Sequence, residues 1–546
     1  MSRVIEIPRG KRTKRYRFFE ILPGFLSYLM VILLIVFSIV SPFLAAIYLL
    51  AVIVMMLVKA TGITIRTVQG NKILRRALAV DWRERLDDLK TPAASYKKYK
   101  NIDSKEYNFA EHLDNLARVA QAEKGRFPEV EDLRHAVILT MYNEGLDVME
   151  PTMQSILQSD FDLKKIILFI AYEERGGAQT EANAKILYKK YKDYFGDIVL
   201  SKHPANIEGE VIGKGGNITY AGRKLKLYAQ RKKINPSNVI VTCLDSDNRP
   251  HSSYFSQVAY EYLVREERKH LSYQPVALFT NNIWDVPAMM RVIAVSNSFW
   301  NLICSMRPHV LRNFASHSQP LDALIEMDFW SVRTIVEDGH QYWRSLFYFE
   351  GNYEVIPIRA PIYQDAVLSN TLLDTLKAQF IQLRRWDYGA SDVAYVGDYM
   401  LSDKRRVRLV SLVPKFVRLL DSHVTLAATA PIVTFGGWVP LLFNHYTRDM
   451  VSFHLPVIVG WVQFVGSLGL MVMIWLSFRI LPKRPEHYSW WRSVLMLVQW
   501  ILMPVVSIVY SSFAAFYSQT RLMLGLYMET FDVTKKSVKK NDQPQG

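Results

Sequence analysis

Residues 239–247 read Val-Ile-Val-Thr-Cys-Leu-Asp-Ser-Asp, an apolar run that ends in two acids one residue apart. The run is short and rich in β-branched residues, so it predicts a strand buried in a sheet. Two carboxylates at the end of such a strand repel each other unless a cation lies between them. Carboxylate oxygens favour Mg²⁺ or Mn²⁺, which in enzymes commonly engage a substrate diphosphate as well. The alternative is a solvated loop in which Asp245 and Asp247 act as turn or helix N-cap residues.

Four more short apolar runs surround this stretch. They occupy residues 135–142, 165–171, 197–200 and 276–279. Segments with helical periodicity separate the first three runs, and strands that alternate with helices indicate parallel βαβ units in a doubly wound sheet. The predicted fold class is therefore an α/β domain with a Rossmann-like, mostly parallel sheet. Ligands of such sheets bind beyond the carboxyl ends of the strands.

Polar side chains follow the predicted strands at that edge. After the first two strands they are Tyr142, Asn143, Glu144 and Glu173. Further along, residues 213–216 read Gly-Lys-Gly-Gly and precede a helical stretch. Glycine lets the backbone approach a phosphate, and Lys214 adds a positive charge. The segment lacks the spacing of a Walker A motif, and taken alone it indicates a turn with an exposed lysine.

Two downstream motifs complete the pattern. Glu337 and Asp338 form an acidic pair, and Gln382, Arg385 and Trp386 belong to a Gln-Leu-Arg-Arg-Trp segment. Taken alone, the first is typical of an exposed acidic pair and the second of a helix face with a packed tryptophan. Their order after the Asp-Ser-Asp segment favours a shared site.

The N-terminal region carries an uncharged stretch, residues 21–58. As one helix it would be about 57 Å long at ~1.5 Å per residue, against a bilayer core of roughly 30 Å. A hairpin broken near Ser41 and Pro42 fits better. Basic residues on both sides of the stretch place both of its ends in the cytoplasm. A cleaved signal peptide is the alternative, but the stretch is too long and lacks a small-residue cleavage site.

Three further apolar stretches lie near the C-terminus, at residues 423–443, 453–477 and 493–517. Basic flanks place both the end of the second stretch and the tail of the chain inside, which conflicts with three full crossings. We expect residues 493–528, which contain Pro504, to form a bent or re-entrant helix pair packed against protein. The mixed basic and apolar residues of 401–422 predict an amphipathic interfacial helix.

The composition limits the class of protein. The chain has 546 residues, a net charge of +16, 50% hydrophobic residues and 2 cysteines, which excludes a disordered protein and a disulfide or zinc scaffold. Much of the positive charge flanks apolar stretches, so no nucleic-acid partner is expected. The predicted parts are a basic N-terminus with a membrane hairpin, a helical connector, the α/β domain, the interfacial helix, C-terminal membrane helices and a basic tail. They span residues 1–58, 59–133, 134–400, 401–422, 423–528 and 529–546.

From about residue 135 to residue 386, the chain resembles membrane-integrated family 2 glycosyltransferases of the cellulose, chitin and hyaluronan synthase type. The strand-end, Gly-Lys, Asp-Ser-Asp, Glu-Asp and Gln-Leu-Arg-Arg-Trp motifs carry the resemblance, in that order. It implies a GT-A fold, catalysis at the cytoplasmic membrane face, a nucleotide-diphosphate sugar donor, Mg²⁺ or Mn²⁺, and inversion at the anomeric carbon. The tail residues Phe531, Val533, Thr534 and Lys535 are similar to the gating-loop motif of cellulose synthases, although that motif stands elsewhere in the chain of those enzymes.

The resemblance also implies a role for each motif residue. Asp338 is the general base and Glu337 positions it. Metal binding falls to Asp245 and Asp247. The residues implied in donor or nucleotide binding are Tyr142, Asn143, Glu144, Glu173, Lys214, Asp245, Gln382 and Arg385. The acceptor contacts are Trp386 and, by its closeness to the base, His340. Members of the family usually carry an aspartate where Glu173 stands, so the nucleotide is left open, with a UDP-sugar as the expected donor.

Three functions are compatible with this pattern. The first is a processive polysaccharide synthase that extends and extrudes a growing glycan. The second is a transferase that adds one sugar to a lipid acceptor in the same membrane. The third is a transporter or channel with an inactive cytoplasmic domain, which predicts ionisable residues inside the apolar stretches, where almost none occur. For either enzyme we expect an integral cell-membrane protein that contacts membrane lipids.

Overall fold

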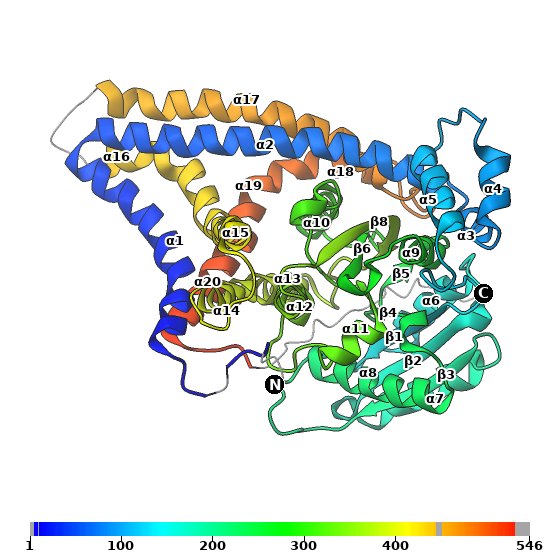
Figure 1. Cartoon of the computed structure of the whole chain (residues 1–546). Coiled ribbons are helices and arrows are strands. Elements are labelled where there is room, and N and C mark those ends of the chain that lie inside the picture. The colour runs from blue at the N-terminus through cyan, green and yellow to red at the C-terminus, as the bar shows by residue number, and fades with distance from the viewer. Residues whose placement is uncertain (1–4, 9, 444–449, 530–546) are drawn as a thin grey trace, which may run out of the picture.

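The computed structural model describes residues 5–8, 10–443 and 450–529. The similarity to a gating loop falls on Phe531, Val533, Thr534 and Lys535, which lie outside these residues. In the described part, an α/β domain lies beside a group of long helices (Figure 1). The predicted fold class is confirmed as an α/β domain with a mostly parallel sheet plus an apolar helical region.

The sheet has eight strands in the order β3-β2-β1-β4-β7-β6-β8-β5. Their bounds are β1 Arg134–Met141, β2 Ile166–Glu173, β3 Asp197–His203, β4 Val239–Leu244, β5 Arg249–Pro250, β6 Leu271–Leu278, β7 Ser318–Pro320 and β8 Glu354–Tyr363. The pairs β1–β2, β2–β3, β1–β4 and β6–β8 are parallel, and β7 joins the two parallel halves through antiparallel pairing. The five predicted strands are present, whereas β5, β7 and β8 were not predicted.

Strand β1 shows why the apolar runs become central strands. Its side chains alternate between two cores: Val137 and Leu139 belong to one, and Ala136 and Ile138 belong to the other. The first core also receives α6 (Leu146–Leu157) and α7 (Gly177–Tyr191), and the second receives α8 (Lys214–Arg231). Because helices cover both faces, every position of a central strand can be apolar.

The strand order fixes where a ligand can bind. The chain runs outward from β1 through β2 to β3 and then returns to place β4 on the other side of β1. The crevice at such a reversal opens beyond the carboxyl ends of the two strands. In this protein those ends lead into Tyr142 and Asp245.

The remaining helices of the α/β domain cover the second half of the sheet and lead toward the membrane region. They are α9 Tyr254–Leu263, α10 Ala288–Ser305, α11 Leu321–Glu326, α12 Glu337–Tyr348, α13 Leu372–Asp387 and α14 Ser391–Met400. The connector forms three short helices, α3 Trp82–Asp88, α4 Pro92–Tyr99 and α5 Phe109–Gln121. Trp82 is buried against Tyr260 of α9, so the connector packs on the α/β domain.

The N-terminal helices form the expected broken hairpin. Helix α1 (Lys14–Val40) ends at Ser41, and α2 (Pro42–Leu78) begins at the proline, which lacks the N–H that would continue the first helix. Helix α2 runs on well past residue 58, so the membrane hairpin and the connector share one helix. Along its length α2 lies beside α17 (Met450–Ile480) (Figure 1).

In the described part of the chain, five segments are long and apolar enough to cross a membrane. They are Lys14–Val40, Pro42–Leu78, Leu409–Phe443, Phe453–Ile480 and Trp491–Leu524. The third differs from the prediction of a separate interfacial helix at 401–422, because α15 runs unbroken over Leu409–Phe435 and α16 (Val439–Phe443) follows. Helix α15 continues through Pro414 and Pro431, so its basic and apolar halves form one helix.

The fifth segment is interrupted, as the predicted bent pair requires. Helix α18 (Trp491–Val498) leads through 3₁₀ turns to α19 (Met503–Val505), a π-helical turn over Val506–Ser512 and α20 (Phe513–Leu524). Pro504 stands just before the π turn, and proline removes a helical hydrogen bond there.

Candidate active site

Lys214 lies at the centre of three of the predicted acids. Its Nζ is 2.8 Å from Asp245 Oδ1, 3.4 Å from Asp338 Oδ1 and 3.9 Å from Glu337 Oε1. The lysine is thus no exposed turn residue, because only 9% of its side chain is exposed. Three motifs that lie far apart in the sequence therefore meet at one ammonium group.

The charges of this cluster are strongly coupled. Burial alone would lower the pKa of Lys214, but the three carboxylates outweigh it and hold the pKa well above its ordinary value. Burial, and then the charge of Asp338, raise the pKa of Glu337 to about 8. Side-chain exposure separates the acids: 3% for Glu337, 23% for Asp338 and 34% for Asp245. The two exposed carboxylates are the ones that can reach a ligand.

Local backbone geometry brings the motifs together. Glu337 and Asp338 occupy the first turn of α12, where acidic side chains stabilise the helix dipole. Lys214 begins α8, and the next residue is a glycine by necessity. A Cβ at Gly215 would lie 2.4 Å from the carbonyl oxygen of Ser331 and 3.3 Å from the Cβ of Glu337. Only a residue without a side chain lets α8 approach the segment that leads into α12.

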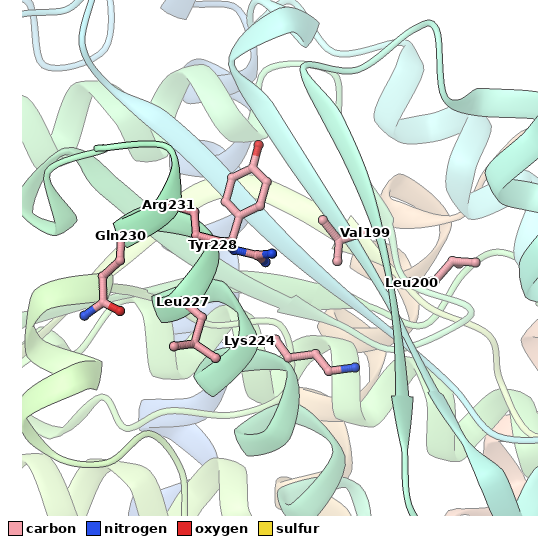
Figure 2. Close-up of a pocket in the computed structure, with 7 residues that line it drawn as sticks. All are labelled: Val199, Leu200, Lys224, Leu227, Tyr228, Gln230 and Arg231. Carbon is pink, nitrogen blue, oxygen red and sulfur yellow. The ribbon is translucent and has the colours of Figure 1, made fainter.

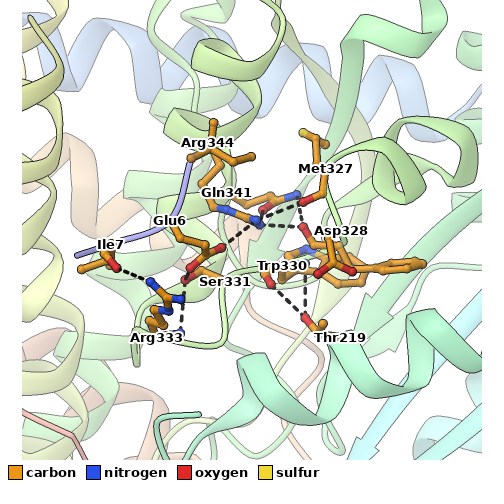
Figure 3. A network of polar contacts seen from close by, with 12 residues as sticks. Glu6, Ile7, Thr219, Met327, Asp328, Trp330, Ser331, Arg333, Gln341 and Arg344 are labelled. Carbon is orange, nitrogen blue, oxygen red and sulfur yellow. Dashed lines mark hydrogen bonds and ion pairs between the residues drawn. The ribbon is translucent and has the colours of Figure 1, made fainter. Parts of the chain in front are cut away.

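The N-terminal segment of the chain holds this same region from the other side (Figure 3). Glu6 accepts a hydrogen bond from Ser331 Oγ at 2.9 Å and pairs with the buried Arg344 of α12 at 2.7 Å. Arg333 donates to the carbonyl oxygen of Ile7 at 2.9 Å. Arg344 in turn donates to the carbonyl oxygen of Phe329 at 2.6 Å. The segment before the first helix thereby stabilises the loop and helix that carry Asp338.

Asp247 is buried beside an acid that sequence reasoning missed. Its Oδ2 accepts the backbone N–H of Asp365 at 3.0 Å. Asn281 donates to the backbone oxygen of Asp247 at 3.1 Å and to Asp365 Oδ1 at 2.9 Å. Asp365 follows β8 as Asp245 follows β4, so recognising β8 as a strand would have identified it.

Helix α13 ends next to this group. The ring of Trp386 lies 6.0 Å from that of Phe279, two residues before Asn281, and 37% of Trp386 is exposed. Gln382 is buried one turn earlier and accepts a hydrogen bond from Gln379. Arg385 precedes Trp386 in the last turn of the helix. The Gln-Leu-Arg-Arg-Trp segment therefore flanks the side of the crevice on which Asp247 lies.

The loop after β1 is held rigidly. Glu144 accepts the backbone N–H groups of Tyr142 at 2.7 Å and Asn143 at 3.2 Å. Thr180 of α7 donates to the carbonyl oxygen of Tyr142 at 2.7 Å. The Glu144 carboxylate thus shapes the loop, and Tyr142 and Asn143 directly follow the carboxyl end of β1.

Glu173 takes part in a buried ionic group at the ends of β2 and β3. It pairs with Arg175 at 2.7 Å and with His203 Nδ1 at 3.0 Å, and His203 Nε2 contacts Glu210 at 3.0 Å. Burial alone would lower the pKa of His203, but hydrogen bonds to the two glutamates raise it to about 9. The group fastens the loop that leads into Lys214.

This raised pKa predicts a pH-dependent stability. Because the folded protein binds the His203 proton more tightly than the unfolded chain does, the stabilisation is complete below about pH 6.5 and is lost as the pH rises through 9. We expect a loss of roughly 2–3 kcal/mol of unfolding free energy over that window. Urea unfolding of the wild type and His203→Gln between pH 6 and 9.5 measures it. Equal slopes for the two proteins would contradict the assignment.

His340 is not an acceptor contact in this structure. Its ring is fully buried, packs on Tyr395 at 4.4 Å and contacts Asp392 through Nδ1 at 2.7 Å. The side chain joins α12 to α14 and has no exposed surface to offer a ligand. We therefore leave His340 out of the proposed site.

A surface hollow of about 560 Å³ lies elsewhere on the domain, between β3 and α8 (Figure 2). Its lining residues are Val199, Leu200, Lys224, Leu227, Tyr228, Gln230 and Arg231. Lys224 is ten residues along α8 from Lys214, roughly 15 Å at the rise of an α-helix. The hollow is separate from the acid cluster.

The acids beyond β4 fit a divalent cation that a substrate completes. Among the described residues there is no group of three or more His, Cys, Asp or Glu side chains able to enclose a metal by itself. Mg²⁺ commonly uses one or two carboxylates and takes its other ligands from substrate phosphates and water. Asp245 and Asp247 supply hard oxygen ligands of that kind.

Similar folds among solved structures belong to glycosyltransferases. A mannosyltransferase from Pyrobaculum calidifontis in complex with GDP-Man and Mn²⁺ is 12% identical, with a TM-score of 0.38 over 79% of this chain and 99% of its own. Residues 1–349 of S. aureus TarS in complex with UDP-GlcNAc are 11% identical, with a TM-score of 0.35 over 72% of this chain and 92% of theirs. No protein-family model and no curated protein matches the chain. An assignment of activity therefore rests on the residues of the site.

Proposed function

We propose that this protein is an inverting, metal-dependent glycosyltransferase that uses a nucleotide-diphosphate sugar at the cytoplasmic face of the membrane. The observation that carries the proposal is the contact of buried Lys214 with Asp245, Glu337 and Asp338. It joins an acid suited to a metal-bound diphosphate with an acid suited to proton transfer. The five apolar segments support a location in the membrane.

The base of the reaction is Asp338. An inverting transfer needs a carboxylate on the face of the donor sugar opposite the leaving group. Asp338 takes the proton of the acceptor hydroxyl as its oxygen bonds to the anomeric carbon and the bond to the nucleoside diphosphate breaks. The contact with Lys214 orients this carboxylate. Glu337, buried behind it with a raised pKa, limits the negative charge of the cluster.

The other side chains bind the two substrates. Asp245 and Asp247 would hold Mg²⁺ or Mn²⁺, which supplies positive charge to the departing diphosphate. Arg385 and Gln382 add hydrogen-bond donors for the same phosphates. Tyr142 and Asn143 would contact the nucleoside, and Glu144 and Glu173 hold the loops behind them through contacts within the protein. Trp386 offers an exposed ring on which an acceptor sugar can stack.

The acceptor is a growing glycan in the leading form of the proposal, so that the enzyme is processive and extrudes its product. Transfer of one sugar to a lipid is the second candidate, and the same residues serve it. Incubating the purified protein in nanodiscs with a panel of labelled nucleotide sugars, UDP-sugars first, tests both. A ladder of products supports the synthase, and one lipid-linked band supports single transfer. The absence of both sugar transfer and nucleotide release with every donor tested would refute the proposed enzymatic activity.

Removal of divalent metal is expected to abolish transfer. EDTA should reduce the rate by at least about 10²-fold, because the diphosphate loses its counter-charge. Added Mg²⁺ or Mn²⁺ should restore activity to the wild type but not to Asp247→Ala. The initial rate of nucleotide release measures this. Full activity in EDTA would contradict the metal role of Asp245 and Asp247.

A further inference from the structure

A group of cations lies at the junction of three elements outside the acid cluster. We call it the cationic junction, and its members are Arg66 of α2, Arg307 after α10, and Lys415 and Arg418 of α15. Two contacts hold the three elements together. Lys59 pairs with Asp421 at 3.0 Å, which joins α2 to α15. A Cβ at Gly70 of α2 would lie 2.8 Å from Leu302 of α10, so these helices touch.

Each of the four cations lies within about two helical turns of one of these two contacts. Arg66 lies one turn from Gly70, and its Nη1 folds back over Gly62, toward the level of the Lys59–Asp421 pair. Arg418 lies one turn before Asp421 on α15, and Lys415 lies one turn further. Burial, and then the guanidinium groups of Arg66 and Arg418, lower the pKa of Arg307. The positive groups therefore repel one another.

The repulsion is not balanced by acids of the chain. Among residues 5–8, 10–443 and 450–529, no carboxylate lies within ion-pair distance of the four cations, and Lys415 donates instead to Tyr342 Oη at 3.3 Å. Two buried nitrogen atoms nearby also lack a hydrogen bond, Arg359 Nε and Trp343 Nε1. Arg359 is 8% exposed, and its Nη1 donates to Ser305 at 2.6 Å.

The surroundings of the cationic junction are apolar and open. Next to the cations of α15, Val410 is 88% exposed and Val417 is 56% exposed, and Ile65 beside Arg66 is 52% exposed. The junction also stands where the apolar part of α2 ends and that of α15 begins. Basic residues at such an edge lie at the level of lipid headgroups.

We propose that the cationic junction binds the phosphate of an anionic lipid headgroup, with the acyl chains against the exposed apolar side chains of α2 and α15. A phosphate supplies the negative charge that the described residues do not provide there, and arginine donors match its oxygens. A free phosphate is also an anion, but it has no acyl chains to bury against the exposed apolar side chains of α2 and α15. The proposal is independent of sugar transfer, because lipid binding is measured without a nucleotide sugar.

Calorimetric titration of the full chain in neutral detergent tests the site. The probes are dioctanoyl phosphatidic acid, dioctanoyl phosphatidylcholine and inorganic phosphate. We expect saturable binding of one phosphatidic acid, at least tenfold weaker binding of the other two probes, and roughly 100-fold weaker binding of phosphatidic acid by Arg307→Gln/Arg418→Gln, about tenfold per cation. Arg406→Gln/Arg408→Gln removes the same charge from exposed positions nearby and should change the affinity less than threefold.

Three results would overturn the proposal. Equal losses in the two double variants would mean diffuse surface charge. Inorganic phosphate bound as tightly as the lipid would mean a site for a free anion. Non-saturable uptake would mean partition into the detergent. Should the first double variant unfold, Arg66→Gln/Lys415→Gln provides the same comparison on the other two members.

Discussion

The Asp338→Asn variant is expected to bind nucleotide sugar with unchanged affinity and to transfer sugar roughly 10³-fold more slowly, the range over which a positioned general base acts. The amide has the shape of the carboxylate but does not accept the proton of the acceptor hydroxyl. Asp338 Oδ1 lies 3.4 Å from Lys214 Nζ, a contact that orients the carboxylate. Calorimetry of donor binding and initial rates of nucleotide release measure the two quantities separately.

A matched control is Asp328→Asn. Asp328 lies in the segment before α12, and its exposed carboxylate pairs with Arg223 of α8. That variant should keep its rate within about twofold, because surface ion pairs contribute little. Wild-type turnover in Asp338→Asn would refute the role of base. Loss of donor binding together with turnover would mean that Asp338 holds the donor instead.

The Lys214→Met variant is expected to be both inactive and much less stable. Methionine fills the space of the lysine stem but removes the ammonium group that the three acids share. Breaking a buried ion pair typically costs about 3–5 kcal/mol, and like-charge repulsion adds to it here. Protonation of Glu337, whose pKa is already about 8, relieves the repulsion, so the deficit should shrink from pH 8 to pH 6.

Urea unfolding of the two proteins at pH 8 and pH 6 measures this difference. Lys226→Met serves as the control, because Lys226 lies on the same helix and is partly exposed. This variant should change the unfolding free energy by less than about 0.5 kcal/mol. Equal stability of Lys214→Met and the wild type would show that the three acids do not depend on the lysine.

The central sheet could be predicted because its strands are buried on both faces. Continuous apolar runs such as 165–171 have no other plausible structure between helical segments. Strands β5 and β7 are only two and three residues long and carry no such signal. β8 is interrupted by Pro357 and Pro361, and proline argues against a central strand. Missing β8 also meant missing Asp365.

The acids of the site could be predicted from their motifs, but the contacts of these acids with Lys214 could not. Lys214 looked like an exposed turn residue because its partners lie 31 and more than 120 positions away. The pairing of His203 with Glu173 and Glu210 depends on the alignment of β2 with β3, which strand patterns alone do not specify. His340 stands next to the base in sequence, yet the turn of α12 directs it into the core.

The contact between Glu6 and Arg344 sets an order for biosynthesis. Glu6 is synthesised before α1 and α2, and its partner Arg344 emerges only after these two helices and most of the sheet. The loop and helix that carry Asp338 therefore receive this contact only once synthesis has passed Arg344. The region around the acid cluster is thus completed after α1 and α2 have been synthesised.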